Sequence, residues 1–401
     1  MRALALGATL AAVLAVAASP AGASPLAYVT QGGFEPGSPV HALAVYDVAT
    51  GMRVRTIDLP GQATDIAIDP TATRAYVATG ADLSVVSLKT GTVLKSIPGV
   101  SGDVAVDPAG DRVYVTNDGT SGKVNVVNTA TETLASPIAV DPYPRSIVVN
   151  PAGTRAYTGD VGPSNSLSVV DLTTDMETAQ VFAGFDRPEN LGISADGARV
   201  YAANFGASAG GTFVSIYEPE PTPMTTPVTV GSTPMGLTTN PAGTRVYVAN
   251  RDSSSISVID DATKAVVDTI PISFSPTAIA ITPDGKRAVV VDSQDEKLGI
   301  LDLATRKLVA GPFALTAAGE VAIPPAQPPA AAFRTKPGIS REPTAFDASA
   351  TQGGPIGRYA WTFGDGKHAG GPKPAVKHSY ATAGTYTVKL PATNGCDPAA
   401  I

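Results

Sequence analysis

One short motif recurs along the chain, and its repetition constrains the fold more than any other feature. The stretch NPAGTRVYVAN at 240–250 has close relatives at four other places: DPAGDRVYVTN at 107–117, NPAGTRAYTGD at 150–160, SADGARVYAAN at 194–204 and TPDGKRAVVVD at 282–292. The tyrosine of the motif recurs every 38 to 48 residues, at Tyr28, Tyr76, Tyr114, Tyr157, Tyr201 and Tyr247, with Val289 in the seventh place. Such a period in strand-like sequence is typical of a β-propeller with four-stranded blades.

Each repeat carries four strand signals, seen most plainly at 234–272. The turn at 240–243 has Pro and Gly where a tight hairpin needs them, and strands are predicted at 245–250, 255–260 and 265–270. The second strand is apolar on both faces, which fits a blade packed between two neighbours. Because one blade cannot bury both faces alone, the unit repeats until a ring closes.

The sequence also predicts how the ring closes. Innermost-strand signals occur seven times, the last being GEVAIPP at 319–325, which no further strand of its own blade follows. The strand around Tyr28 has no innermost strand before it. We therefore expect the two to combine in one blade, which removes the open sheet edges.

This pattern resembles the YVTN-repeat propeller family, whose units are similar to PDGxxVYVAN…ISVIDxxTxxVxxTIPV. The resemblance extends from Tyr28 to Pro325 and implies an all-β, seven-bladed β-propeller over 24–325. Members of that family are often secreted or surface-layer-like proteins. Related seven-bladed rings carry lactonase or lyase activities, so the resemblance leaves the chemistry open.

The C-terminal part differs in composition. A Pro/Ala-rich linker is expected at 326–337, followed by alternating apolar positions and Gly-rich turns at 338–401. FDAS at 346–349, YAWTFGDG at 359–366 and HSYATAGTYTV at 378–388 resemble the polycystic-kidney-disease (PKD) domain, apart from Thr362, where that family usually has Asp. The resemblance implies a small immunoglobulin-like β-sandwich that acts as an extracellular spacer or as a protein- and glycan-contact module.

The N-terminal residues predict export. Residues 1–23 have a basic start, an apolar run and a small-x-small site at Ala21–Ala23, which is typical of a cleaved signal peptide. Without Arg2, the chain has 27 Lys and Arg against 35 Asp and Glu, which disfavours nucleic acid or anionic lipid as a partner. We expect no membrane insertion and a monomer. Cys396 is the single cysteine, so no internal disulfide can form.

The sequence has few side chains that could catalyse a reaction or bind a metal ion. Of three histidines, only His41 lies in the propeller region, while His368 and His378 lie in the sandwich region. A triad or a His-rich metal site in the ring has to use His41, for which we favour a strand-end role. A structural hydrogen bond is expected for His378. The Gly-Asp-Gly turn at 364–366 is better explained by Asp365 bonding its own turn than by calcium, and GASAGG at 206–211 lacks the context of a phosphate cradle.

One group of residues stands out at the predicted channel mouth. The position before each innermost strand is occupied, in ring order, by Glu320, Asp65, Asp103, Ser146, Asn190, Gly236 and Ala278. Arg145 and Glu189 lie one residue earlier in two of these strands. Two interpretations are open: solvated charge around a water-filled mouth, or a ligand site. Such a site would hold a cation or an amine, or would use two carboxyl groups as an acid/base pair. If the cation is calcium, its ligands would be Asp65, Asp103 and Glu320.

The sequence thus favours a secreted or cell-surface, non-catalytic binding or scaffold protein. Its partner is expected to be an extracellular protein or a polysaccharide, with no cofactor except calcium under consideration. The alternative is a propeller enzyme of the lactonase or lyase type that uses the acidic residues of the mouth.

Overall fold

A computed structural model describes most of the chain. The described residues are 25–32, 41–100, 102–117, 119–206, 210–315, 318–325, 334–335, 344–348, 356–371, 373, 375–382, 386–390 and 392–394. They fall into two compact units, one of which is Pro25–Pro325 while the other follows it. The predicted signal peptide at 1–23, Cys396 and most of the predicted linker lie outside the described residues. In the part of the chain that is described, all regular structure is β, and no helix is long and apolar enough to span a membrane.

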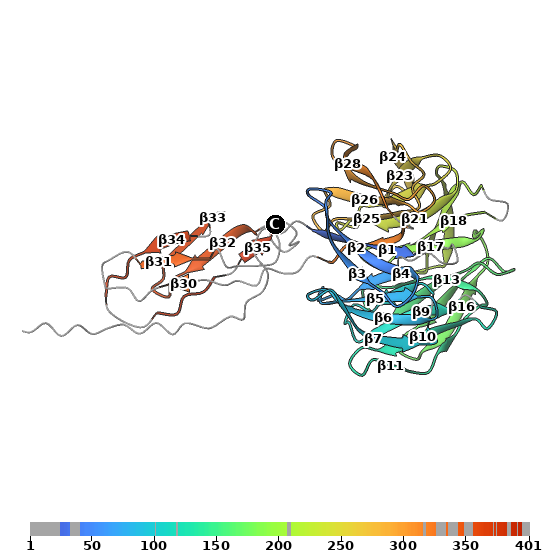
Figure 1. The fold of residues 1–401 in the computed structure, drawn as a ribbon, viewed down its shortest axis with the longest axis horizontal. Helices are drawn as coiled ribbons and strands as arrows, with labels where there is room; N and C mark the ends of the chain where they lie inside the picture. Colours follow the sequence, from blue (N-terminus) through green and yellow to red (C-terminus); the bar gives the residue numbers. More distant parts are fainter. Residues whose placement is uncertain are drawn as a thin grey trace, which may run out of the picture. The chain divides into compact units, whose positions relative to one another are not determined.

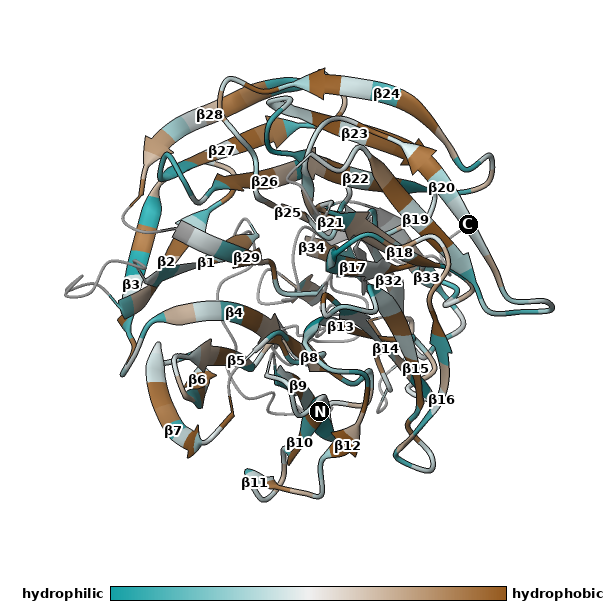
Figure 2. Cartoon of the chain, turned by 90° about the vertical axis from the view of Figure 1, so that its right-hand side faces the viewer, coloured by the Kyte–Doolittle hydropathy of each residue, from teal (hydrophilic) through white to brown (hydrophobic). Residues whose placement is uncertain are grey.

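The first unit is a ring of seven antiparallel sheets, as predicted (Figures 1 and 2). Strands nearest the centre are β4 (Ala63–Ile68), β8 (Val104–Val106), β13 (Pro144–Val149), β17 (Pro188–Ile193), β21 (Pro234–Thr239), β25 (Ala278–Ile281) and β29 (Ala318–Ala322). Second strands are β5 (Arg74–Thr79), β9 (Arg112–Asn117), β14 (Arg155–Asp160), β18 (Val200–Asn204), β22 (Arg245–Asn250), β26 (Arg287–Asp292) and β1 (Leu26–Gly32). We number the blades 1 to 7 in this order.

The outer half of each blade has the same plan. Third strands are β6 (Asp82–Ser87), β10 (Lys123–Asn128), β15 (Ser166–Asp171), β19 (Phe213–Glu218), β23 (Ser255–Asp260), β27 (Lys297–Asp302) and β2 (His41–Asp47). Rim strands are β7 (Thr92–Pro98), β11 (Thr133–Leu134) with β12 (Ile138–Ala139), β16 (Met176–Val181), β20 (Met224–Thr229), β24 (Ala265–Pro271), β28 (Lys307–Ala314) and β3 (Arg53–Asp58). In blade 2 the rim strand is split, next to Pro137, which has no N–H to give to the ladder.

Ring closure follows the prediction. Strand β29 pairs with β1 in blade 7, with Tyr28 opposite Ala322 and Val29 opposite Val321. One blade is therefore made from both ends of the propeller segment, and β1 is paired on both sides, by β29 and by β2.

The apolar side chains of the repeat form a core at every junction between blades. Seven hydrophobic clusters occupy the seven junctions, and each draws residues from two adjacent blades. At the junction of blades 4 and 5, for example, Tyr201 and Val214 pack with Val246 and Val248. Burial against both neighbours explains why the second strand is apolar on both faces.

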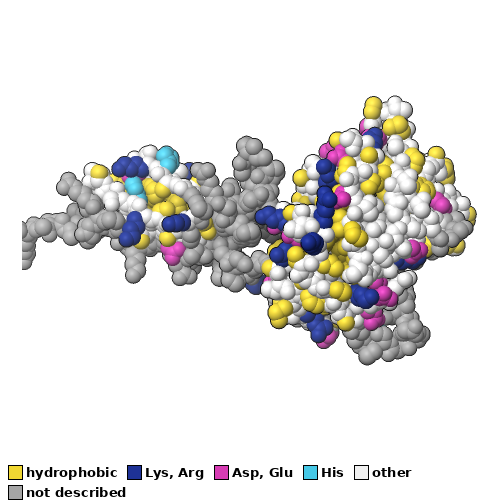
Figure 3. All heavy atoms as spheres, turned by 90° about the horizontal axis from the view of Figure 1, so that it is seen from above, with side chains coloured by type: hydrophobic (Ala, Val, Ile, Leu, Met, Phe, Trp, Pro, Cys, Tyr) yellow, Lys and Arg dark blue, Asp and Glu magenta, His cyan; other side chains and the backbone are white. Residues whose placement is uncertain are grey.

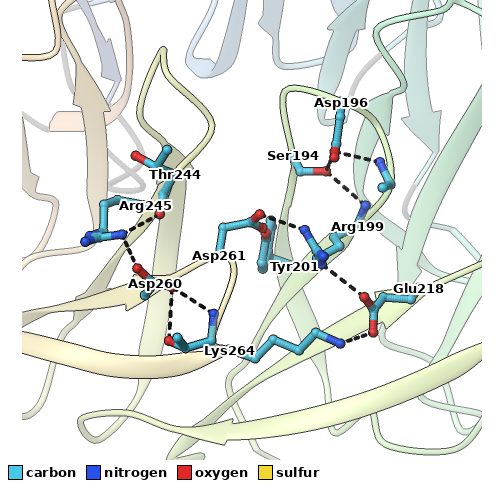
Figure 4. A network of polar contacts seen from close by, with 12 residues as sticks. Ser194, Asp196, Arg199, Tyr201, Glu218, Thr244, Arg245, Asp260, Asp261 and Lys264 are labelled. Atoms are coloured by element: carbon cyan, nitrogen blue, oxygen red, sulfur yellow. Dashed lines mark hydrogen bonds and ion pairs between the residues drawn. The ribbon is translucent and has the colours of Figure 1, made fainter.

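The arginine of the repeated motif links blades at the rim. In blades 1 to 4 and 6 it reaches the turn between the third and rim strands of the next blade. Its partners are Glu132 for Arg74 (3.1 Å), Asp175 for Arg112 (2.7 Å), Glu220 for Arg155 (3.2 Å), Asp261 for Arg199 (2.6 Å) and the Val48 carbonyl for Arg287 (2.6 Å). The fullest network joins blades 4 and 5, where Tyr201 and Arg199 bond to Asp261, and Glu218 pairs with Arg199 and Lys264 (Figure 4).

The second unit consists of two three-stranded sheets, in agreement with the predicted sandwich. One has the order β30 (Arg334–Thr335), β31 (Thr344–Asp347), β34 (Ala375–His378), and the other β33 (His368–Gly371), β32 (Ile356–Thr362), β35 (Ala392–Asn394). Its core is aromatic, with Phe346, Trp361 and Phe363 almost fully buried. His378 bonds Asp365 at 2.7 Å, and Asp365 also accepts the Lys367 N–H, so the expected structural roles of both residues are confirmed.

Candidate functional site at the mouth of the propeller

The mouth face is the face of the ring formed by the start of each innermost strand, the residues just before it and the loops between second and third strands. Asp65, Ser146, Asn190 and Glu320, which the sequence placed before these strands, lie in their first three residues. On its inner edge, side chains of one blade bond to the backbone of the next. The carboxylate of Asp65 accepts the Val104 N–H at 2.6 Å, and that of Asp103 accepts the Ile147 N–H at 2.7 Å. Asn190 does the same for the Leu237 N–H at 3.2 Å. We call these three contacts the channel latches, because each ties adjacent innermost strands together.

The backbone of Asp103, a latch residue, and that of Glu320 are also bonded by side chains of their own blades. The Thr116 hydroxyl accepts the Asp103 N–H at 2.8 Å, and the Thr30 hydroxyl accepts the Glu320 N–H at 2.7 Å. These bonds come from the second strands β9 and β1. The positions of the acidic side chains are therefore fixed by the blades to which they belong.

The structure brings Asp65, Asp103 and Glu320 together on three consecutive blades. Each residue keeps part of its surface accessible, although the ring encloses its carboxyl group. Burial raises the pKa of Glu320 to about 8, the charge of Asp65 adds to the shift, and Arg145 opposes it. Burial also raises the pKa of Asp65, and burial followed by the Asp65 charge raises the pKa of Asp103 well above its usual range. These carboxyl groups hold protons more tightly than free ones.

Asp65 and Asp103 are close enough for the charge of Asp65 to disfavour ionisation of Asp103, which adds to the rise in the pKa of Asp103 caused by burial. The pair resembles two carboxyl groups that cannot both ionise at short range. Both members are also latch residues, so their carboxyl groups bond to the backbone of the ring.

Metal-ligating groups are sparse in the described part of the molecule. No cluster of three or more His, Cys, Asp or Glu side chains there is arranged to hold a metal ion. Calcium binding at Asp65, Asp103 and Glu320 stays a prediction. His41 is the first residue of β2, and its Nδ1 atom is buried with no hydrogen-bond partner among the described residues.

The remaining predicted site residues lie farther round the mouth face. Arg145 and Glu189 form an ion pair at 3.0 Å that joins blades 3 and 4, and Arg187 adds a second contact to Glu189 at 2.9 Å. At this junction the latch position is Ser146, whose hydroxyl is buried and finds no hydrogen-bond partner within the described part of the chain. The ion pair thus links the two blades where the side chain of Ser146 makes no latch.

A groove of about 360 Å³ lies on the mouth face between blades 3 and 4. Its walls are Tyr143, Val161, Gly162, Pro163, Asn165 and Arg187. Tyr143 and Arg187 precede the innermost strands of the two blades, whereas the other four residues belong to the loop between β14 and β15. We call this site the 3–4 groove.

The 3–4 groove is built on unusual backbone. Tyr143 and Arg187 have φ values of 61° and 54°, and Asn165 has a φ of 46°. Such left-handed conformations are uncommon outside glycine, and a residue before proline normally prefers extended backbone. Thr233 has the same conformation (56°) at the equivalent place in blade 5, so the backbone belongs to the fold, while the tyrosine and arginine side chains distinguish this junction.

Arg187 is held in one orientation by its surroundings. Its guanidinium pairs with Glu189 and lies 4.8 Å from the centre of the Phe205 ring, while Arg251 lies 5.2 Å from the same ring. The backbone N–H of Arg187 is bonded by the Asn165 side-chain oxygen at 3.1 Å. A donor fixed in this way binds a ligand with little further loss of side-chain freedom.

Sequence reasoning located the acidic residues but missed the 3–4 groove. A signal was present, since Tyr143–Pro144 and Arg187–Pro188 put a large side chain before the proline that begins an innermost strand. Local preference for that position predicts extended backbone, which gives no indication that the two side chains share a groove.

Comparisons with known proteins agree with the fold. Residues 228–314 match the YNCE-like beta-propeller family, and residues 325–400 match the PKD domain family. No curated protein matches the chain.

Two solved structures are similar in fold. One is hydrazine synthase from Kuenenia stuttgartiensis, with a TM-score of 0.57, 17% identity, and coverage of 66% of this chain and 90% of that one. The other is a functionally unknown protein from Desulfotomaculum acetoxidans, with a TM-score of 0.61, 16% identity, and coverage of 75% and 99%. At such identities the likeness extends to the fold alone. The chain thus contains a seven-bladed β-propeller, part of which matches the YNCE-like beta-propeller family, and a C-terminal segment that matches the PKD domain family.

Proposed function

We propose that this chain is a non-catalytic binding protein that acts outside the cell, at the surface or in the medium. The mouth face of the propeller takes up an extracellular polysaccharide or protein, and the PKD domain serves as a spacer or as a second contact module. The predicted signal peptide and the PKD match support an extracellular place of action.

The observation that supports this proposal most strongly is that the acidic residues of the channel and the residues of the 3–4 groove have different roles on the mouth face. The oxygens of Asp65 and Asp103 bond to the backbone of adjacent blades, whereas the 3–4 groove offers an aromatic ring and an oriented guanidinium to a ligand. Side chains that serve the ring structurally are poorly placed to exchange protons with a substrate. This arrangement favours binding over a lactonase or lyase reaction in the channel.

Retention of the full chain on insoluble polysaccharides, together with a turnover assay on lactones and uronates, tests the proposal. We expect retention on at least one polysaccharide or extracellular protein and no turnover. Lactone or uronate turnover that is abolished by Asp65→Asn or Asp103→Asn would establish the enzyme alternative instead. A chain that is retained by neither class of partner would contradict the binding role.

A further inference from the structure

We propose that the 3–4 groove binds a neutral saccharide, with a sugar ring packed against Tyr143 and its hydroxyls accepting hydrogen bonds from Arg187 and Asn165. This inference rests on the proposed binding function and names its site and ligand class.

Tyr143 supplies the apolar surface. Its ring lies directly against Gly162, where an added Cβ would be only 2.9 Å from the ring Cδ2 atom and 3.0 Å from the Pro142 oxygen. The ring thus packs against the backbone at Gly162 and lines the groove. Aromatic rings present an apolar face, on which the C–H groups of a sugar can pack while its hydroxyls remain free to bond.

Arg187 and Asn165 supply directed donors. Of the five N–H groups of the Arg187 guanidinium, the ion pair with Glu189 uses one. The oxygen of the Asn165 amide is engaged by the Arg187 N–H, and its Nδ2 group has no acceptor among the described residues. Hydroxyl groups can accept from both, and these few fixed polar groups give the orientation that a small-ligand site needs.

The charges around the groove favour a neutral ligand. Arg145 and Arg187 share the carboxylate of Glu189, and Arg251 pairs with Asp252 at 2.7 Å. On the propeller surface visible in Figure 3, acidic side chains likewise lie close to basic ones. Because Glu189 already neutralises the charge of Arg187, a carboxylate on the ligand would gain less from this guanidinium than from an unpaired one, whereas neutral hydroxyls can use its remaining N–H groups.

The size of the groove favours a saccharide over a protein. A specific protein interface covers about 800 Å² on each partner, far more than six groove residues provide, whereas small-ligand pockets begin at about 300 Å³. The 3–4 groove, with a volume of about 360 Å³ and open to solvent, suits a short stretch of sugar units, such as a chain end or a branch.

Isothermal titration calorimetry on the full chain tests this proposal with maltohexaose, cellohexaose, chitohexaose and hexagalacturonate as probes. We expect at least one of the three neutral hexasaccharides to bind more tightly than hexagalacturonate. Tyr143→Ala should weaken that binding about tenfold or more, because it removes the central aromatic contact. Asn165→Asp keeps an oxygen for the Arg187 N–H but removes the Nδ2 donor, so it should weaken binding about three- to tenfold.

Phe182→Ala is the matched control, because Phe182 is an exposed aromatic residue (56%) that does not line the groove, and it should leave affinity unchanged. The proposal is overturned if none of the neutral probes binds, if hexagalacturonate binds best, or if Tyr143→Ala and Asn165→Asp bind like the unmodified chain. Retention on a polysaccharide that survives both substitutions would leave the binding function standing and place its site elsewhere. If Tyr143→Ala fails to fold, Asn165→Asp alone decides.

Discussion

At the scale of single residues, burial raises the pKa values of the carboxyl groups at the mouth, so their protonation depends on pH near neutrality. The alignment of repeats predicted which residues face the mouth, because one position recurs at each innermost strand. It did not predict the channel latches, since the bond from Val104 to Asp65 depends on how one blade is rotated against the next. Neither interpretation drawn from the sequence included a bond to the neighbouring backbone.

Glu320 makes the stability of the fold depend on pH. Its pKa is about 8 in the folded chain against 4.5 ordinarily, so the folded state binds this proton more tightly than the unfolded state. The stabilisation is full below pH 4.5 and is lost as the pH rises through about 8. Glu320→Gln should therefore raise the melting temperature at pH 9, by an amount corresponding to about 1–3 kcal/mol, and flatten its pH dependence. Calorimetric scans from pH 5 to 9 measure both effects, and parallel curves for the two proteins would disprove the assignment.

Two substitutions of Asp103 distinguish its role as a hydrogen-bond acceptor from the effect of its negative charge. Asp103→Asn keeps an oxygen for the Ile147 N–H and removes the repulsion with Asp65, so its free energy of unfolding at pH 8 should equal or exceed that of the unmodified chain. Asp103→Ala leaves the N–H unsatisfied and should cost about 1–3 kcal/mol. Asp111→Ala, at an exposed aspartate of the same blade, is the control for denaturant titrations. Equal losses for the Asn and Ala variants would argue against a latch.

At the scale of elements, the repeated motif is explained by contacts between blades. Its apolar residues fill the seven junctions, and its arginine reaches the next blade at the rim. The period and the strand pattern were sufficient to predict this architecture, because every blade must bury both of its apolar faces against neighbouring blades. The split rim strand of blade 2 departs from the pattern at Pro137, and the 3–4 groove arises from left-handed backbone that local sequence preferences disfavour.

The rim arginines should differ in importance according to their burial. Arg199 and Asp261 have side chains exposed by only 21% and 15%, whereas Arg112 and Asp175 are exposed by 38% and 39%. Arg199→Ala should lower the free energy of unfolding by about 2–3 kcal/mol, since it leaves both Glu218 and Asp261 with fewer partners. Arg112→Ala should cost about 0–1 kcal/mol. Urea titrations compare the two, and equal losses would contradict a burial-dependent network.

At the scale of the whole molecule, the pairing of β29 with β1 closes the ring. A chain that ends before Ala318 lacks β29 and exposes the edge of β1, so it should aggregate, whereas a chain that ends after Pro325 keeps the closed blade. Size-exclusion chromatography with thermal melting distinguishes them. Two monomeric truncations with the same melting temperature would show that closure by β29 is dispensable.

The central claim is that the mouth-face carboxylates hold the ring together while the 3–4 groove holds the ligand. Hydrogen–deuterium exchange of the full chain, with and without the tightest-binding hexasaccharide, tests it in one measurement, because the candidate sites fall in different peptides. We predict slower exchange on ligand binding at 142–146 and 161–166, with no change at 63–67, 102–106 or 344–348. Slower exchange in the channel segments 63–67 and 102–106, or in the PKD domain alone, would contradict the claim.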